Sequence, residues 1–420
     1  MKINSFIEVE KYLRATYPDK MSTNWTFALK DMQKILYNLG DPQDKIQTFH
    51  VAGTSGKTST AYYLSDMLSS TQKNVGLYIS PHVDSVTERI QINNRPLSKN
   101  QFTKMFSEFI NQPAIKDKQI SYFGLLAAFA YWVFAQKKLD YSVIEVGMGG
   151  RLDATNVIKN QNKICVITDI GMDHTEYLGN NLIAIAKEKA GIIGKNNNVF
   201  IAPQTPKIID VFDKVAKQNN AKLHIMPKNY IDNTPKDLPL FQKRNWSLAN
   251  FVFNSMNFGT KTNRNTIITK TPINVPARME TIDLNNKKII LDVSHNAQKI
   301  SALVKSIKYK YPNKNTAVLL SMSKNKDSSA EQSLTTLKQI SNTLIISKFI
   351  GEKGTNHRAM RMSTIENQAQ KTGFNNIITI NNPIQAFNAL LEQQEDILLV
   401  TGSFFLLNDI RPILNKRGLL

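Results

Sequence analysis

A glycine-rich stretch that ends in a lysine and two hydroxyl residues has the composition and spacing of a phosphate-binding loop. Residues 52–59 read Ala-Gly-Thr-Ser-Gly-Lys-Thr-Ser, between a predicted buried strand at 46–51 and a predicted helix that begins near Lys57. Such a turn brings backbone N–H groups and the positive end of a helix close to a bound anion. Val51 stands where the strict G-x-x-x-x-G-K-[ST] pattern has its first glycine, so the stretch is a narrower variant. Its place between a strand and a helix favours nucleoside triphosphate binding over a chance glycine turn.

Each residue type in this loop has its own task in phosphate binding. Gly53 and Gly56 permit the tight turn and the close approach of the backbone. Lys57 adds a positive charge on a long side chain, and Thr58 or Ser59 offers a hydroxyl ligand to Mg²⁺. The residues expected to contact the nucleotide here are Gly53, Thr54, Ser55, Gly56, Lys57, Thr58 and Ser59.

Three further polar residues follow predicted strands and could complete a metal site. Glu145 lies near the end of a predicted strand at 141–146, before a run of glycines, and His174 closes a polar motif after a predicted strand at 163–169. A carboxylate and an imidazole beside a triphosphate suit Mg²⁺, directly or through water. The alternatives are a carboxylate that caps a turn and a histidine without a ligand role, and the strand-end positions favour the metal roles. For Ser80, turn former and metal ligand stay equally open.

Charged residues later in the chain admit two interpretations. Lys187 and Lys189 lie on a predicted helix, and their spacing alone favours a solvated charged face over phosphate binding. Asp292 and His295 end a predicted strand, and Arg278 precedes them. An arginine from a second domain is a common way to stabilise phosphoryl transfer, although one arginine in a linker is weak support.

Strands alternate with helices along most of the chain, which predicts two α/β domains with mostly parallel sheets. Because ligands bind at the carboxyl ends of parallel strands, the polar motifs are expected to gather at one edge of the first sheet. We expect residues 1–275 to form the nucleotide-binding domain and residues 276–420 the second, smaller domain. In that domain the predicted strands are 289–293, 316–322, 343–349, 376–380 and 397–401, and the predicted helices are 297–311, 328–341, 363–372 and 383–394.

Composition fits a soluble globular protein and excludes several other classes. The one cysteine, Cys165, lies in a predicted strand, which excludes a disulfide framework and a cysteine metal site and fits a reducing cytosol. The most apolar run, 123–135, is too short to cross a membrane and predicts a buried helix. The first residues lack the apolar core of a signal peptide. The formal charge of +20 is spread along the chain without a basic-aromatic repeat. Nucleic-acid binding is therefore a minor hypothesis, and a cytoplasmic protein without a membrane partner is expected.

Taken together, these motifs resemble the Mur ligase superfamily and, within it, the folylpolyglutamate synthase/dihydrofolate synthase family. The resemblance extends over most of the chain, and the Gly-Gly-Arg-Leu-Asp-Ala-Thr-Asn run at 149–156 is its most specific part. Because the phosphate loop begins within the first sixty residues, we expect no uridine-nucleotide domain of the kind found in the peptidoglycan ligases. The other landmarks are the segments at 39–43, 50–57, 80–82, 88–93, 145–148, 173–176, 187–192, 276–278 and 291–296.

This resemblance implies a two-domain ligase of Mur architecture: an N-terminal P-loop-type ATPase domain and a smaller Rossmann-like domain. It implies that ATP phosphorylates a carboxylate and that an amine of L-glutamate displaces the phosphate, with (tetrahydro)folate and, as an open question, dihydropteroate as acceptor. ATP and Mg²⁺ are the implied cofactors, and we expect a monomer. The implied metal ligands are Thr58, Ser80, Glu145 and His174, and the added nucleotide contacts are Asn245, Arg278 and Asp292. The implied catalytic residues are Lys57, His174, Lys189, Arg278 and His295, with Lys189 matching a lysine that is carbamylated in relatives.

Two departures from the family pattern keep an alternative open. The loop reads Gly-Lys57-Thr-Ser where the folate branch usually has Gly-Lys-Gly-Ser, and Gly124 replaces a common glutamate on the pterin side. The alternative is a Mur-type ligase that joins an amino acid to a different carboxylate, such as a cell-wall precursor. A protein of another class, a silent binder with this fold, would not need to keep Lys57, Glu145 and His174.

Overall fold

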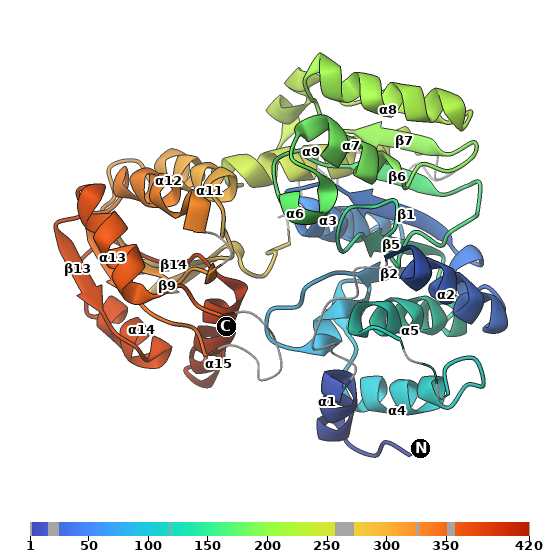
Figure 1. The fold of residues 1–420 in the computed structure, drawn as a ribbon, viewed down its shortest axis with the longest axis horizontal. Helices are drawn as coiled ribbons and strands as arrows, with labels where there is room; N and C mark the ends of the chain where they lie inside the picture. Colours follow the sequence, from blue (N-terminus) through green and yellow to red (C-terminus); the bar gives the residue numbers. More distant parts are fainter. Residues whose placement is uncertain are drawn as a thin grey trace. The chain divides into compact units, whose positions relative to one another are not determined.

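The computed structural model describes residues 2–15, 25–116, 118, 120–256, 273–324, 327–350 and 358–419. The chain divides into two compact units, each described by itself (Figure 1). Unit 1 comprises residues 1–236 and 242–273, and unit 2 comprises residues 237–241 and 274–420. The alternating pattern within residues 257–276 predicts a further strand, and most of this segment lies outside the described residues.

Unit 1 is built on an eight-stranded sheet in the order β4-β3-β2-β5-β1-β6-β7-β8. The six strands from β2 to β8 in that order pair in parallel, whereas β3 and β4 form antiparallel pairs at one edge. The mostly parallel sheet predicted for this unit is therefore confirmed. The strands are β1 (Gln47–Ala52), β2 (Val75–Tyr78), β3 (Ile90–Ile92), β4 (Arg95–Pro96), β5 (Tyr141–Glu145), β6 (Ile164–Ile167), β7 (Asn198–Ile201) and β8 (Lys222–Ile225).

Helices cover this sheet because parallel strands must be joined by crossovers. The helices of unit 1 are α1 (Phe6–Ala15), α2 (Trp25–Asn38), α3 (Lys57–Ser69), α4 (Lys99–Ile110), α5 (Tyr122–Gln136), α6 (Thr175–Leu178), α7 (Leu182–Ala190), α8 (Pro206–Gln218) and most of α9 (Leu240–Ser255). Three short 3₁₀ turns accompany them: η1 (Pro42–Asp44), η2 (Val86–Arg89) and η3 (Lys228–Asn233). Helix α3 packs against β1, β2 and β5, so the phosphate loop at its start is supported from below by the middle of the sheet.

Among the described residues, two apolar clusters help to hold the helices of unit 1 in place. The larger one joins α1, α4 and α5 around Phe102, Phe106 and Phe129, whose rings pack edge-to-face or stacked. Helix α5 contains the apolar run that was predicted to be a buried helix, and this is confirmed. The other cluster joins α7 and α8 to β6 and β7 and includes the fully buried Cys165, as expected for a small core residue. No helix among the described residues is long and apolar enough to cross a membrane.

Unit 2 has a six-stranded sheet in the order β13-β12-β11-β14-β10-β9. All neighbours pair in parallel except β9, which is antiparallel to β10. The strands are β9 (Arg278–Leu284), β10 (Lys287–Asp292), β11 (Thr316–Leu320), β12 (Thr343–Ile346), β13 (Asn376–Thr379) and β14 (Ile397–Thr401). The helices are α11 (Ala297–Lys310), α12 (Asp327–Lys338), α13 (Met362–Lys371), α14 (Pro383–Leu391) and α15 (Phe404–Lys416).

Sequence patterns predicted five of these six strands but missed two elements that matter for the site. Strand β9 mixes charged and apolar residues, as an edge strand can, because one of its sides faces no further strand. Helix α15 contains Pro412, a residue that disfavours a helix interior, yet Leu406, Ile410 and Leu414 bury one face of it. In both cases tertiary packing outweighs the local pattern.

Candidate active site

The phosphate loop connects the carboxyl end of β1 to the start of α3, and its two glycines adopt conformations that other residues rarely take. Gly53 has φ 151° and Gly56 has φ 90°. A side chain at Gly53 would overlap Thr168, and one at Gly56 would overlap the amide of Asn245. Both positions therefore require glycine for space as well as for backbone conformation.

Hydrogen bonds tie this loop to the segment that follows β6. The backbone N–H of Thr54 donates to the carbonyl of Asp169 (2.7 Å), and the Thr54 hydroxyl donates to the carbonyl of Gly171 (3.0 Å). From the other side, the Thr168 hydroxyl donates to the carbonyl of Ser55 (2.7 Å). The loop conformation is thus fixed by its neighbours rather than left to a ligand.

The charged and amide groups expected to contact the nucleotide surround this loop. The Lys57 ammonium donates to the carbonyl of Gly53 (3.1 Å), so its positive charge lies over the loop. Asn245, from α9, packs against Gly56, and its amide nitrogen donates to Gln242 (3.3 Å). The resemblance implied that Asn245 contacts the nucleotide; the fold places Asn245 beside Gly56, and the nucleotide contact stays a prediction.

Three of the four predicted metal ligands are joined by direct hydrogen bonds. Glu145 is 1% exposed at the end of β5; its Oε1 accepts from the Thr58 hydroxyl (2.8 Å) and its Oε2 from the backbone N–H of Ser80 (3.0 Å). Their hydroxyl and carboxylate oxygens are hard donors that suit Mg²⁺, which usually keeps several water ligands. No three His, Cys, Asp or Glu side chains gather as a metal cluster within the described residues, so any metal here would rely on hydroxyls and water as well.

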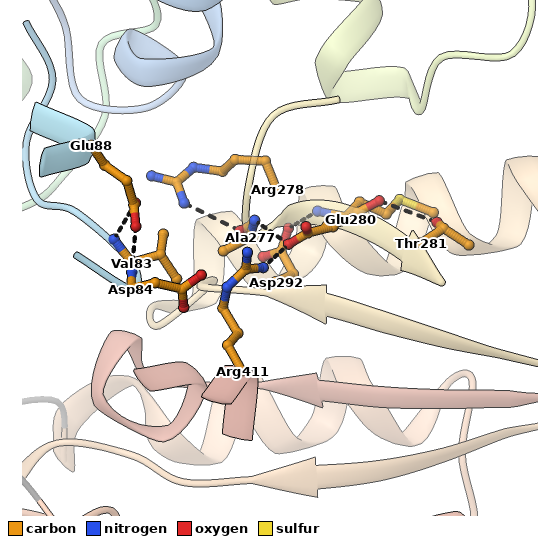
Figure 2. Close-up of polar contacts among 10 residues, drawn as sticks. Val83, Asp84, Glu88, Ala277, Arg278, Glu280, Thr281, Asp292 and Arg411 are labelled. Carbon is orange, nitrogen blue, oxygen red and sulfur yellow. Dashed lines mark hydrogen bonds and ion pairs between the residues drawn. The ribbon is translucent and has the colours of Figure 1, made fainter. Parts of the chain in front are cut away.

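Glu88 shapes the segment that follows Ser80. Its carboxylate accepts backbone N–H groups from Val83 (2.8 Å), Asp84 (2.7 Å) and Ser85 (2.7 Å), the first two of which appear in Figure 2. Burial raises the pKa of the Glu88 carboxyl, and the backbone hydrogen bonds act against that rise. The chain beside Ser80 is therefore held in one conformation by a single side chain.

His174 and Lys189 lie on the segment after β6, in different surroundings. His174 is exposed and begins α6 in the left-handed conformation (φ 49°), with its backbone N–H donating to Asp173 (3.2 Å). Lys189 is 3% exposed, whereas Lys187 on the same helix is exposed. The prediction from spacing alone, that Lys189 lies on a solvated charged face, is wrong, because Lys189 lies on the buried face of α7. Gly150 fits against the carbonyl of Glu188, since a Cβ there would lie 2.8 Å from it.

Two groups near the loop were not predicted. Arg244 forms an ion pair with Asp169 and donates to the carbonyl of Pro203 (2.7 Å), which holds the residue before Asn245 against the ends of β6 and β7. Burial raises the pKa of Asp169, and the positive charge of Arg244 opposes this. No spacing signal links Arg244 to Asp169, because the two meet only in the folded chain.

The other unpredicted group is buried behind the loop. Asp153 accepts from the backbone N–H (2.9 Å) and hydroxyl (2.6 Å) of Thr155, and the backbone N–H of Met148 donates to it as well (2.9 Å). Burial raises the pKa of Asp153, partly offset by these hydrogen bonds and by the charge of Lys57. His50 completes the chain of contacts through the Thr155 hydroxyl (2.8 Å). Asp153 lies in the most specific landmark run, which was the available sequence signal.

In unit 2 the predicted residues Arg278 and Asp292 lie opposite each other where β9 begins and β10 ends (Figure 2), and His295 follows three residues after Asp292. Asp292 pairs with Arg278 across the sheet at a register shift, and burial raises the pKa of its carboxyl. His295 Nδ1 lies 2.8 Å from the carbonyl of Val293, which can only accept, so Nδ1 carries the proton. Nε2 is then free to accept from the Lys299 ammonium (3.1 Å).

These features define a class: a strand–loop–helix phosphate site with a hydroxyl–carboxylate metal site, followed by a second α/β unit, is the architecture of the Mur-type ligases. Residues 51–229 match the family Mur ligase middle domain, and residues 277–404 match Mur ligase, glutamate ligase domain. The chain belongs to the folylpolyglutamate synthase/dihydrofolate synthase family of this superfamily.

Individual relatives match over nearly the full chain. Dihydrofolate synthetase of Saccharomyces cerevisiae is 30% identical, covering 92% of this chain and 98% of its own. Dihydrofolate synthase/folylpolyglutamate synthase of Bacillus subtilis is 26% identical, covering 90% and 93%. The structure of Mycobacterium tuberculosis folylpolyglutamate synthase complexed with ADP and AMPPCP superposes with a TM-score of 0.81 at 25% identity, covering 97% of this chain and 98% of that one.

Proposed function

We propose that this protein is an ATP-dependent ligase that adds L-glutamate to tetrahydrofolate, and that dihydropteroate is a second acceptor. The observation that carries the proposal is the intact phosphate loop, with Thr58 and Ser80 bonded to the buried Glu145, in a chain that belongs to this family. The Saccharomyces relative is named a dihydrofolate synthetase, and the Bacillus relative is named a dihydrofolate synthase/folylpolyglutamate synthase. These names support including both dihydropteroate and tetrahydrofolate as acceptors in the proposal.

The reaction has two chemical steps. A carboxylate oxygen of the acceptor attacks the γ-phosphorus of ATP, ADP leaves, and an acyl phosphate forms. The amine of glutamate then attacks the acyl carbon, and the tetrahedral adduct loses phosphate and a proton to give the amide. Because charge builds up on the transferred phosphoryl group, fixed donors and cations around it lower the barrier.

We assign the roles within unit 1 from these requirements. The backbone of Gly53 to Gly56 cradles the phosphates, Lys57 offsets their charge, and Asn245 beside Gly56 contacts the nucleotide. Thr58, Ser80, Glu145 and His174 would hold Mg²⁺, which would supply Lewis-acid stabilisation of the phosphates. The buried Lys189 is proposed to form a carbamate, in which its amine nitrogen bonds to the carbon of carbon dioxide and a proton is released.

In unit 2, Arg278 is proposed to stabilise the charge on the transferred phosphoryl group, and Asp292 to contact the nucleotide. His295 is proposed to assist at the same step, with Nδ1 protonated and Nε2 as acceptor. As parts of the same proposal, residues 1–275 bind ATP and residues 276–420 act as the ligase domain. We also propose that the protein is cytoplasmic and monomeric and that it binds no nucleic acid.

The decisive experiment is phosphate release from Mg·ATP with glutamate, run with tetrahydrofolate, dihydropteroate or neither. The proposal expects turnover only when a pterin acceptor is present. Tight ATP binding without turnover on either acceptor would instead favour a Mur-type ligase for another carboxylate, because Gly124 stands where a glutamate is common on the pterin side of the folate branch.

A further inference from the structure

The backbone on both sides of Arg278 is held in an unusual conformation. Ala277 has φ 56° and Met279 has φ 53°, so two residues with side chains occupy the left-handed region. This region is costly for alanine and methionine and persists only where surrounding contacts enforce it. The strain therefore points to groups that fix the turn from which the Arg278 side chain extends.

Two buried carboxylates make those contacts, one on each side of Arg278 (Figure 2). Glu280 Oε2 accepts the backbone N–H of Ala277 (2.8 Å), and Asp292 Oδ2 accepts the backbone N–H of Met279 (2.8 Å). Glu280 is 5% exposed and Asp292 2%, so neither can exchange these donors for bulk water. The two left-handed residues are thus each anchored by a charge-assisted hydrogen bond.

The countercharge for Glu280 comes from the last helix. Arg411 of α15 is 6% exposed and forms an ion pair with Glu280 through the same oxygen that binds Ala277 (Figure 2). A buried carboxylate without a partner is strongly destabilising. The positive charge of Arg411 offsets the desolvation of the Glu280 carboxylate, which can then hold the Ala277 backbone within the core. The same helix carries Phe404, whose ring centre lies 5.2 Å from the Arg278 guanidinium carbon.

Phe404 and Arg411 are seven residues apart, which is two turns of a helix, so they lie on one face of α15. One face of α15 therefore acts on Arg278 in two ways. Phe404 contacts the guanidinium, and Arg411 acts on the backbone beside Arg278 through Glu280.

We propose that α15 is a positioning element for Arg278, with Arg411 and Glu280 setting its backbone and Phe404 its guanidinium. The inference rests on the proposed function, in which Arg278 stabilises the transferred phosphoryl group. Glu280, Arg411 and Phe404 are positioning residues and need not touch substrate. Their effect should be concentrated in kcat, because misplacing Arg278 weakens the transition state more than it weakens binding of ATP through the phosphate loop.

The test replaces the ion pair by apolar residues of similar volume, Glu280→Met with Arg411→Leu, because such a double replacement removes both buried charges together. Phosphate release from Mg·ATP with glutamate and a pterin acceptor gives kcat and the KM for ATP, and the midpoint of thermal unfolding reports folding. We expect kcat to fall about 10- to 100-fold, with the KM for ATP within about threefold. Phe404→Leu, which leaves the pair intact, should lower kcat about threefold to tenfold.

A double-mutant cycle with Arg278→Ala distinguishes positioning from general damage. If the pair acts through Arg278, the apolar double variant should lower kcat little further once Arg278 is absent. Lys314→Met, which breaks the exposed ion pair of Lys314 with Asp396 (2.8 Å) in the same unit, is the matched control and should leave kcat unchanged.

Each result decides a separate claim. Unchanged kcat in both the folded double variant and Phe404→Leu, while Arg278→Ala is impaired, overturns the inference alone. Full activity of Arg278→Ala overturns the role of Arg278 in the proposed function. If the double variant does not fold, Phe404→Leu within the same cycle decides: a loss of kcat that disappears in the Arg278→Ala background supports the inference, and an additive or absent loss overturns it.

Discussion

The phosphate loop of unit 1 and the Arg278 turn of unit 2 solve one problem in opposite ways. Both need a backbone with positive φ beside a charged side chain, after the end of β1 in the loop and at the start of β9 in the turn. The loop uses Gly53 and Gly56, which accept positive φ and leave room for Thr168 and Asn245. The turn uses Ala277 and Met279 and holds them by buried carboxylates. In unit 1 the residue type itself permits the positive φ, whereas in unit 2 tertiary contacts enforce it.

The strongest challenge to this contrast is Gly56→Ala. A Cβ at Gly56 would overlap the Asn245 amide at φ 90°, so we expect ATP affinity to fall by about 100-fold or more. Isothermal titration with Mg·ATP measures the loss. Gly40→Ala is the matched control: its φ is 79°, but the nearest atom to a Cβ is the Lys45 ammonium at 3.7 Å. It should lower the unfolding free energy by about 1–2 kcal/mol and leave ATP affinity unchanged. Equal affinity of the two variants would contradict the spatial role of Gly56.

The next variant tests how far unit 1 depends on side chains. Thr58→Val keeps the shape of the residue but removes the donor to the buried Glu145. We expect turnover to fall about tenfold and the Mg²⁺ concentration for half-maximal turnover to rise, because an unsatisfied buried acceptor costs about 1–3 kcal/mol. A titration of phosphate release against Mg²⁺ measures both. Thr58→Ser should restore most of the activity, and an unchanged Mg²⁺ requirement in Thr58→Val would exclude the hydroxyl from the metal site.

A smaller effect is expected where a side chain supports the loop from a distance. Arg244→Met breaks the ion pair with Asp169 and the contact with Pro203, beside Asn245. Because the pair is partly exposed, the unfolding free energy should fall by only about 1 kcal/mol, and the KM for ATP should rise about threefold to tenfold through displacement of Asn245. Lys73→Met, which breaks an exposed pair with Asp140 (3.2 Å), should leave that KM unchanged. A KM shift of the same size in both variants would remove Arg244 from the support of the loop.

The smallest effect completes the contrast. Ala277→Gly removes the backbone strain of a left-handed alanine in the folded state, but it raises the conformational entropy of the unfolded chain, which costs about 0.4–1 kcal/mol. Because the two effects oppose each other, the unfolding free energy should change by about 1 kcal/mol or less. Because Glu280 and Asp292 still hold the turn, kcat should change by about twofold or less. Chemical denaturation and steady-state rates measure the two quantities. A large loss of kcat would mean that alanine itself, and not the carboxylates, fixes the turn.

Features that depend on local residue type could be predicted from the sequence, whereas features that depend on tertiary contacts could not. The phosphate loop and Glu145 could be predicted because glycine spacing and strand periodicity are local signals, whereas spacing left Ser80 open between a turn former and a metal ligand. The burial of Lys189 and the ion pair of Arg244 with Asp169 depend on how distant segments meet, so spacing could not reveal them. Helix α15 was missed for a similar reason: its Pro412 disfavours a helix locally, and tertiary contacts, among them packing against β14 and α14, stabilise it. The catalytic, nucleotide-binding and metal-binding roles assigned to the site residues, those of His174 and His295 included, stay predictions.

The contact between Glu280 and Arg411 also orders events during synthesis. The ribosome adds Arg411 after Arg278 and after every strand of the unit 2 sheet, so Glu280 has no countercharge until α15 has emerged. A nascent chain can already contain the complete phosphate loop while the turn around Arg278 still lacks its partner. The phosphate loop is therefore synthesised before the support that α15 gives to Arg278, and a chain halted ahead of α15 would have the Asp292 contact at this turn but neither Arg411 nor Phe404.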